Sequence, residues 1–406
     1  MRKSLFVLVV FAFLGCVLNG VGFAEDKLIK IGAAVSLTGK MAYEGKMVLD
    51  GYKVWENWVN THGGIKAGDT VYKVKMIYYD DESKPVRGAK LTEKLITQDK
   101  VRFLMGPFSS SITFATTAIG EKYNLITIAP EANATKVYER GYKNVFSILP
   151  PATMLMVPIV EFSKELSPKP KTVAVIVAND LFPLSCADGF KDACEKAGYE
   201  IVLFEKYPAG ATDISALLTK VKKANPDILG LAGYTADAIM LMRQAKELNL
   251  NPKMYAIAVG VMVRGFREEL GKDSNYAVEG EWWLPSMKLK DDVFGTTADY
   301  IKACKAMFGA DYMPGYHCAS ASAAGTLLQM AIQRAGSLDT DAVRKTLGEF
   351  DGELATWPAI AFNQKGQNIK WMHPVVQVQD GEYIVLYPAG SKEKDAIYPA
   401  PAWSER

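Results

Sequence analysis

Short apolar runs alternate with longer amphipathic segments along the first half of the chain. The apolar runs have the length of buried strands and lie at 27–37, 72–79, 101–105 and 125–129. The segments between them carry apolar residues at helical spacing and lie at 41–60, 86–98 and 113–123. Strands that alternate with helices in this way predict a parallel sheet that is covered by helices on both faces.

The same alternation begins again after Pro150 and Pro151. Strand-like runs recur at 172–177, 201–204, 228–231 and 254–258, and helical segments fill the gaps between them. Two stretches also match locally, because 103–125 and 229–250 each run from a strand through a glycine and an aromatic residue into a helix that ends in Asn-Leu. The sequence therefore predicts an α/β fold with two similar, Rossmann-like lobes.

The C-terminal part of the chain is expected to return to both lobes. It is mostly helical from 294 to 350 and then strand-like at 370–378 and 383–387. We therefore expect discontinuous lobes, with crossovers near Pro150, Glu281 and Pro358. The expected division is 25–149 with 282–357 for lobe 1 and 150–281 with 358–390 for lobe 2. Residues 391–406, rich in proline and charge, are expected to form a loosely attached tail.

The first 24 residues differ in composition from the rest of the chain. Arg2 and Lys3 give a basic start, an apolar stretch follows from 5 to 18, and the segment ends in the small residue Ala24. This pattern is typical of a secretory signal, and the apolar stretch is short for a membrane span. We therefore expect cleavage near Ala24 and export of the mature protein.

One alternative to ordinary cleavage is lipoprotein processing. Leu14-Gly15-Cys16 partly resembles the lipoprotein signal, but Phe13 is bulky where that signal usually has an aliphatic residue. Cleavage near Ala24 accounts for the segment without lipidation of Cys16, so we favour it.

The remaining cysteines lie in a compartment that permits disulfides. Cys186 and Cys194 fall on one predicted helix, where their spacing separates them by roughly 12 Å, so they cannot pair. Cys304 and Cys318 lie near the facing ends of two successive helices, which leaves a disulfide and two buried free thiols as alternatives. The three histidines of the chain are too dispersed to suggest a metal site.

Charge and motifs argue against several functions. The 47 basic and 45 acidic residues nearly cancel, and the lysines are scattered, so nucleic acid is not an expected partner. The chain has no Gly-x-Gly-x-x-Gly turn after the first strand, no phosphate-binding loop and no Gly-x-Ser-x-Gly elbow. An α/β enzyme is therefore the weaker alternative, and we expect no catalytic residue and no cofactor.

A run of three serines follows the strand at 101–105 and begins the next helix. In open parallel sheets, ligands bind beyond the carboxyl ends of the strands, where helix N-termini present unpaired N–H groups. The hydroxyls of Ser109, Ser110 and Ser111 could bind a carboxylate there without a lysine or arginine. The alternative is ordinary capping of the helix by one of these serines.

Short motifs occur in a specific order along the mature chain. They are Ile31-Gly32, Leu37-Thr38-Gly39, Tyr43-Glu44-Gly45, Asp80-Asp81, Gly106-Pro107, Ala129-Pro130-Glu131-Ala132 and Gly233-Tyr234. With them, residues 27–388 resemble the type I periplasmic binding proteins of the branched-chain amino acid and amide class. The resemblance implies two lobes joined by a three-strand hinge, a ligand in the cleft between them, and an ABC permease of the inner membrane as partner. We expect a monomer.

The resemblance also implies roles for particular residues. Ser109 or Ser110, with the backbone around Ala132 and Asn133, would receive a ligand carboxylate. Tyr43 would form the wall of the pocket on lobe 1. Tyr234 and Phe182 would close over the ligand from lobe 2. For Tyr43 and Tyr234, packing against the lobe surface is the alternative.

One departure from the family pattern bears on the ligand. Amino-acid binders of this family generally place an acid just before the glycine that is Gly260 here, and this chain has Ala258-Val259 instead. A buried ammonium needs an acidic partner. Either Asp180 or Glu281 takes this role, or the ligand carries no ammonium.

Two aromatic pairs leave further alternatives open. Trp282-Trp283 favours a flat or apolar ligand such as an aromatic carboxylate, unless both indoles simply fill the lobe junction. Tyr316-His317 begins a predicted helix that could face the cleft, and a solvated or capped histidine is the alternative there.

We expect a solute-binding protein of an ABC importer that closes its lobes on a carboxylate-bearing ligand. A sensor of the same fold that signals to a receptor or regulator is the main alternative.

Overall fold

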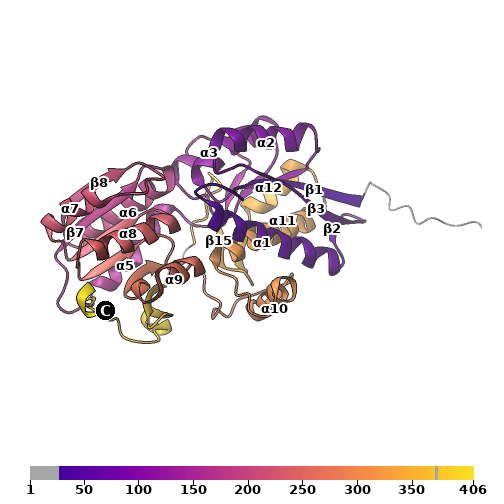
Figure 1. Ribbon diagram of the computed structural model, residues 1–406. Helices are drawn as coiled ribbons and strands as arrows, with labels where there is room; N and C mark the ends of the chain where they lie inside the picture. The colour runs from indigo at the N-terminus through magenta and orange to yellow at the C-terminus, as the bar shows by residue number, and fades with distance from the viewer. Residues whose placement is uncertain (1–26, 371–373) are drawn as a thin grey trace, which may run out of the picture.

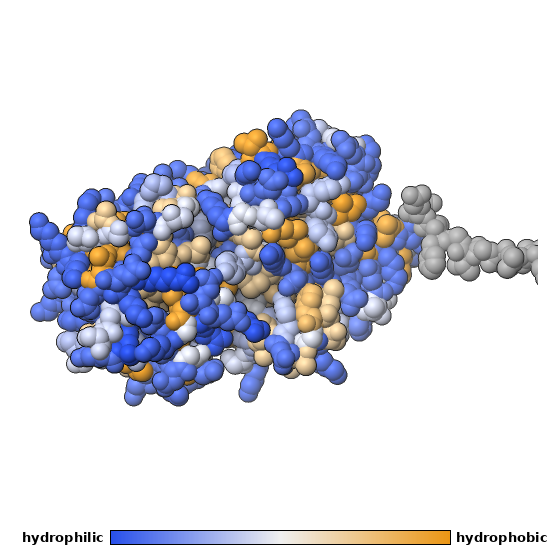
Figure 2. Space-filling view, in the orientation of Figure 1, coloured by the Kyte–Doolittle hydropathy of each residue, from blue (hydrophilic) through white to orange (hydrophobic). Residues whose placement is uncertain are grey.

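Two lobes lie side by side, each built on its own sheet (Figure 1). The computed structural model describes residues 27–370 and 374–406. The expected signal peptide, its cleavage near Ala24 and Cys16 lie outside the described residues. Hydrophilic residues cover much of the visible face of both lobes, with smaller hydrophobic patches between them (Figure 2). The predicted α/β fold with two lobes is confirmed.

Lobe 1 contains a six-stranded sheet in the order β2-β3-β1-β4-β5-β6. Its strands are β1 (Leu28–Val35), β2 (Ile65–Ala67), β3 (Thr70–Asp80), β4 (Phe103–Met105), β5 (Thr127–Ala129) and β6 (Val145–Ser147). All neighbours are parallel except β2 and β3. The helices of this lobe are α1 (Ala42–Thr61), α2 (Pro85–Thr97), α3 (Ser110–Lys122), α4 (Thr135–Tyr138), α10 (Thr297–Phe308), α11 (Tyr316–Ala335) and α12 (Thr340–Gly348).

Lobe 2 contains a seven-stranded sheet in the order β17-β16-β11-β10-β9-β7-β8. Its strands are β7 (Thr172–Ala178), β8 (Glu200–Tyr207), β9 (Ile228–Ala232), β10 (Met254–Ile257), β11 (Ala277–Gly280), β16 (Val375–Gln379) and β17 (Glu382–Tyr387). β7 to β11 are parallel, whereas β16 and β17 are antiparallel additions at one edge. The helices are α5 (Val157–Ser163), α6 (Leu181–Lys196), α7 (Ser215–Ala224), α8 (Thr235–Glu247) and α9 (Arg264–Leu270).

Strand β7 shows why these strands read as continuous apolar runs. Val173, Val175 and Val177 join the core that also contains Phe190 of α6, and the alternate residues join the core on the opposite face. Successive side chains of a strand point to opposite faces, and both faces of this sheet are covered by helices. Apolar residues are therefore required at every position.

The contact between α1 and α11 depends on two glycines. A Cβ atom at Gly51 would lie 2.2 Å from the carbonyl oxygen of Cys318, and one at Gly325 would lie 2.1 Å from the ring of Trp55. Trp55 is fully buried, and its Nε1 donates to Oε1 of Gln329 at 3.1 Å. The absence of side chains at both glycines lets the two helices approach closely enough to bury this indole.

The chain crosses between the lobes at three places. It enters lobe 2 after β6 and returns after β11 to form the small pairs β12 (Lys290–Asp291) with β13 (Gly295–Thr296) and β14 (Asp351–Leu354) with β15 (Trp357–Ala361). Asn368 still contacts lobe 1, because its Nδ2 donates to the carbonyl of Ile148 at 2.7 Å. Pro358 lies inside β15, so the third crossing comes later along the chain than the boundary that we expected there.

The two stretches that match in sequence occupy equivalent places in the two lobes. β4 leads into α3, and β9 leads into α8. The asparagines that follow the two helices, Asn124 and Asn249, have φ values of 53° and 48°. Asparagine tolerates this left-handed conformation, which ends a helix, and this explains why it recurs at both sites.

The C-terminal residues pack firmly on lobe 2, so the expectation of a loosely attached tail is wrong. Trp403 is buried, and its Nε1 donates to the carbonyl of Leu250 at 2.9 Å and to the Tyr255 hydroxyl at 3.0 Å. The backbone of Ala400 donates to the carbonyl of Lys253 at 2.9 Å. These contacts fix a segment whose composition suggested loose attachment.

All four cysteines of the described residues are buried free thiols. Of the two alternatives for Cys304 and Cys318, the structure has the thiols, and the hydroxyl of Tyr300 donates to Sγ of Cys318 at 3.3 Å. Within the described ranges, no helix has the length and apolar character needed to cross a membrane.

Candidate ligand-binding site

The serine turn lies between β4 and α3, and each serine already has a partner in the protein. Ser109 caps α3, because its Oγ accepts a hydrogen bond from the Ile112 N–H at 3.4 Å. Oγ of Ser110 accepts from the Ala134 N–H at 3.2 Å, and the hydroxyl of Ser111 donates to Asp180. Accepting a bond does not use the hydroxyl hydrogen, so Ser109 and Ser110 can still donate to a ligand oxygen.

Ser109 and Ser110 line a small cavity between the lobes. Its volume is about 10 Å³, the space of about one water molecule. The other lining residues are Phe108, Glu131, Leu149, Phe182, Tyr234 and Tyr316. A ligand of amino-acid size therefore requires the two lobes to move apart.

Aromatic rings from both lobes meet over this cavity. Tyr234 stacks on Phe182 with ring centroids 5.8 Å apart, and it meets the edge of Phe108 at 5.6 Å. Phe108 and Tyr234 are the aromatic residues of the two matching stretches. The equivalent turns of the two lobes thus face each other across the cleft.

Four of the nine residues that we predicted for the site line this cavity: Ser109, Ser110, Phe182 and Tyr234. The other five do not line it, and their roles remain predictions. Tyr43 is 43% exposed, and its hydroxyl donates to Glu269 on lobe 2. Ala132, Asn133, Ala258 and Trp282 are buried in the protein.

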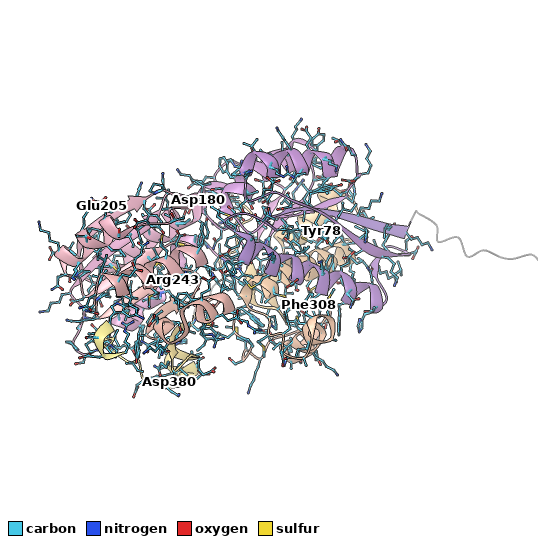
Figure 3. All side chains as sticks on the ribbon, viewed as in Figure 1. Tyr78, Asp180, Glu205, Arg243, Phe308 and Asp380 are labelled. Carbon is cyan, nitrogen blue, oxygen red and sulfur yellow. The ribbon has the colours of Figure 1, made fainter. Side chains whose placement is uncertain are left out.

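Polar contacts across the cleft hold the lobes together. Oε1 of Glu44 in lobe 1 accepts from the backbone N–H of Thr235 at 3.2 Å and from its hydroxyl at 2.6 Å. Asp180 in lobe 2 receives the hydroxyl of Ser111 and lies 3.6 Å from Nζ of Lys40. Figure 3 shows Asp180 where the two lobes meet.

The carboxylate of Asp180 is fully engaged by protein groups. Besides Ser111 and Lys40, it accepts from the backbone N–H of Leu181 at 2.8 Å and from the hydroxyl of Tyr234 at 3.3 Å. Of the two acids that we considered for a ligand ammonium, Asp180 therefore has the less suitable environment.

A buried ion pair that sequence reasoning did not find lies beside the cavity. Nδ1 of His317 is 2.7 Å from Oε2 of Glu131, and the hydroxyl of Ser320 donates to Oε1 at 3.1 Å. His317 is 1% exposed, so the solvated histidine that we considered is wrong. Burial opposes a charged imidazole, but the adjacent Glu131 outweighs it and raises the pKa of His317.

Two more buried acids lie at the second crossover. Oε1 of Glu281 accepts from the backbone N–H groups of Trp282 and Trp283 at 2.8 and 3.4 Å. Burial raises the pKa of Glu281 to about 7. Burial and the nearby Glu281 raise the pKa of Glu279 well above its ordinary value. Within residues 27–370 and 374–406, no group of three or more histidine, cysteine, aspartate or glutamate side chains is arranged to hold a metal ion.

These raised pKa values predict that stability falls as the pH rises from about 5 to about 8. The folded protein holds protons on Glu281 that the unfolded chain releases, so raising the pH through this window favours unfolding. The shift of Glu281 from 4.5 to about 7 corresponds to roughly 3 kcal/mol. Glu279 and His317 change stability in the same direction. Thermal unfolding across this pH range measures the effect, and Glu281→Gln should flatten the curve. A melting temperature that rises through this window would contradict the assignment.

Comparisons with known proteins agree with this architecture. The model of the periplasmic binding protein family matches residues 28–382. A leucine-, isoleucine-, valine-, threonine- and alanine-binding protein of Pseudomonas aeruginosa is 28% identical over 356 residues, which cover 85% of this chain and 89% of the relative. A Leu/Ile/Val-binding protein homolog of Brucella abortus is 24% identical over 375 residues, or 89% and 91% of the two chains.

Two solved structures share the fold. The branched-chain amino acid transporter substrate-binding protein of Streptococcus pneumoniae in complex with isoleucine has a TM-score of 0.76 at 21% identity, covering 88% of this chain and 98% of its own. A solute-binding protein of an ABC transporter from Rhodopseudomonas palustris, in complex with 3,4-dihydroxybenzoic acid, also has a TM-score of 0.76, at 20% identity and 92% and 99% coverage. Because the family model spans most of the sequence, this chain belongs to the periplasmic binding protein family.

Proposed function

We propose that this protein is the periplasmic solute-binding component of an ABC importer. It captures a small carboxylate-bearing molecule by lobe closure and delivers it to a permease of the inner membrane. The observation that carries this proposal is the serine turn of lobe 1, which faces the aromatic pair Phe182 and Tyr234 of lobe 2 across one cavity. The relatives are named as binding proteins for amino acids, which carry a carboxylate.

Lobe closure requires contacts that exist only when the lobes meet. Glu44 to Thr235 and Ser111 to Asp180 are such contacts, because each joins the two lobes. A ligand that accepts a hydrogen bond from Ser110 of lobe 1 and packs on Tyr234 of lobe 2 adds further contacts between the lobes. Its higher affinity for the closed arrangement shifts the protein toward that arrangement.

Replacing Ser110 by alanine should weaken carboxylate binding by about 1 to 3 kcal/mol, because a desolvated anion loses a hydrogen-bond donor. Ser109→Ala should have a similar effect on binding, and it should also lower stability because this serine caps α3. Calorimetry with the carboxylate identified by mass spectrometry of the purified protein measures the loss. Ser185→Ala is the control, because that hydroxyl donates to a carbonyl within α6, at 3.1 Å. If both turn variants bind like the wild type, the ligand lies elsewhere.

The ligand of the serine cavity should lack an ammonium group. Ala258 and Val259 are buried where the family resemblance places an acid in amino-acid binders. Asp180 and Glu131 are engaged by protein groups, and Glu281 does not line this cavity. We expect aromatic or short aliphatic carboxylates to raise the melting temperature more than leucine, isoleucine or valine at equal concentration. A thermal-shift screen measures this directly. Stronger stabilisation by a branched-chain amino acid would contradict it.

A further inference from the structure

A larger cavity lies beside the serine cavity, against the second crossover. Its volume is about 660 Å³, within the range of about 300 to 1,000 Å³ that is usual for small-molecule sites. Lobe 1 contributes Met47 and the segment 311–317, and lobe 2 contributes the start of α9 with parts of β16 and β17. Tyr316 lines both cavities. A molecule in this space contacts both lobes and the hinge.

Five buried polar atoms belong to side chains that line this cavity and have no hydrogen-bond partner among the described residues. They are Oε2 of Glu281, Nε2 of His317, Nε1 of Trp283, Nε of Arg267 and the hydroxyl oxygen of Tyr383. Glu281, His317 and Trp283 are each only 1% exposed. Unpaired buried polar atoms are destabilising and uncommon in folded proteins. Five of them on side chains that line one cavity point to a ligand with polar groups.

One carboxyl group in the lining of this cavity is available to a cation, because Oε2 of Glu281 is buried and unpaired. The neighbouring carboxyls raise one another's pKa values, since Glu131 acts on Glu281 and Glu281 acts on Glu279. The imidazole of His317 is bonded to Glu131. Two arginines also line the cavity, and both have other contacts, although Nε of Arg267 has no hydrogen-bond partner among the described residues. Arg264 is paired with Glu268 at 2.6 Å, and Arg267 stacks on the Tyr383 ring at 3.9 Å. Oε2 of Glu281 is the buried, unpaired carboxyl oxygen of this lining, so it is the atom at which a positive group of a ligand can bind, and such a group favours the ionised carboxylate.

The remaining lining suits the body of an organic cation. Trp283, Tyr312 and Tyr316 present aromatic rings, and aromatic faces attract cations. Met262, Leu284, Met313, Pro314, Val376 and Val385 supply apolar surface. A carboxylate, aromatic rings and apolar walls around one cavity complement an amine that carries a bulky apolar group.

We propose that this cavity is a second ligand site, which binds an organic amine with an apolar body through Oε2 of Glu281. Occupation of this site stabilises the closed arrangement, because both lobes line it. The proposal is independent of the carboxylate site at the serine turn, since the two sites use different polar groups.

Calorimetry with three probes of one shape tests the charge preference. Phenethylamine, phenethyl alcohol and hydrocinnamate share a phenyl group on a two-carbon chain and differ in charge. The amine should bind the wild type at least about tenfold more tightly than the alcohol, because only the amine forms a charge-assisted bond to Glu281. Glu281→Gln should remove this advantage. Equal binding of amine and alcohol, or an unchanged amine affinity in Glu281→Gln, would overturn the proposal.

A steric variant keeps the test decisive if Glu281→Gln folds poorly. Met313 lines the cavity and is 55% exposed, so Met313→Trp can fill the space without disturbing a core. It should abolish amine binding, whereas Met307→Trp, at another exposed methionine outside the lining, should not. Amine binding that survives Met313→Trp would overturn the proposal. Hydrocinnamate binding to Ser110→Ala tests the carboxylate site separately, so the failure of one site is distinguishable from the failure of the other.

Discussion

Replacing Trp403 by alanine is expected to lower the free energy of unfolding by about 3 to 5 kcal/mol, the usual cost of removing a buried indole. The side chain is 7% exposed and donates two hydrogen bonds into lobe 2. Its loss leaves a cavity beside Tyr255 and exposes the buried hydroxyl of that residue. Denaturant unfolding of the purified protein measures the change.

The neighbouring Ser404 provides a matched control for this variant. Ser404 is exposed, so Ser404→Ala should leave stability unchanged. The tail has other attachments, because the side chains of Gln377 and Gln379 donate to the carbonyls of Ile397 and Asp395. Deletion of 391–406 should therefore cost at least as much as Trp403→Ala. A fully stable protein without these residues would show that the tail is dispensable, as its composition suggested.

The second large effect is expected at the buried pair of Glu131 and His317. Glu131→Ala should destabilise the protein by about 3 to 5 kcal/mol, because it leaves an uncompensated imidazole in the interior. The same measurement on Arg264→Ala should show little change, because the pair of Arg264 and Glu268 is exposed to solvent.

A double-mutant cycle separates the interaction energy of Glu131 with His317 from the cost of removing each side chain alone. Combining Glu131→Ala with His317→Ala should cost less than the sum of the two single changes, since the second change removes the stranded partner of the first. Additive losses would show that the two side chains do not interact energetically. The cycle is measured by the same unfolding experiments.

Much of the fold could be predicted because long, strongly patterned segments determine it. The apolar run at 27–37 contains β1, and the segment 86–98 nearly coincides with α2. The small pairs β12 with β13 and β14 with β15 escaped prediction, because these strands are polar or contain a proline and lack the continuous apolar run that marks β4 and β5. Residues 363–369 were expected in lobe 2, but the side chain of Asn368 ties this segment to lobe 1.

The candidate site could be predicted only in part, for a physical reason. Helix N-termini at the ends of strands are visible in sequence, and this led to Ser109 and Ser110. The pairing of Glu131 with His317 joins residues far apart in the chain, so local pattern gives no sign of it. One clue was available in the sequence. Glu131 follows the end of a strand and His317 lies at the start of a helix, and both of these ends were expected at the same cleft. The larger cavity has no local signal either, because segments from across the chain form it.

The packing of Trp55 against Gly325 limits the order in which the molecule can be assembled. A ribosome completes α1 long before it begins α11. The indole of Trp55 therefore lacks its packing partner until most of the protein has been synthesised. A fragment that ends at residue 149 lacks this cover and should remain partly unfolded. Lobe 1 therefore reaches its final structure only late in synthesis or after it.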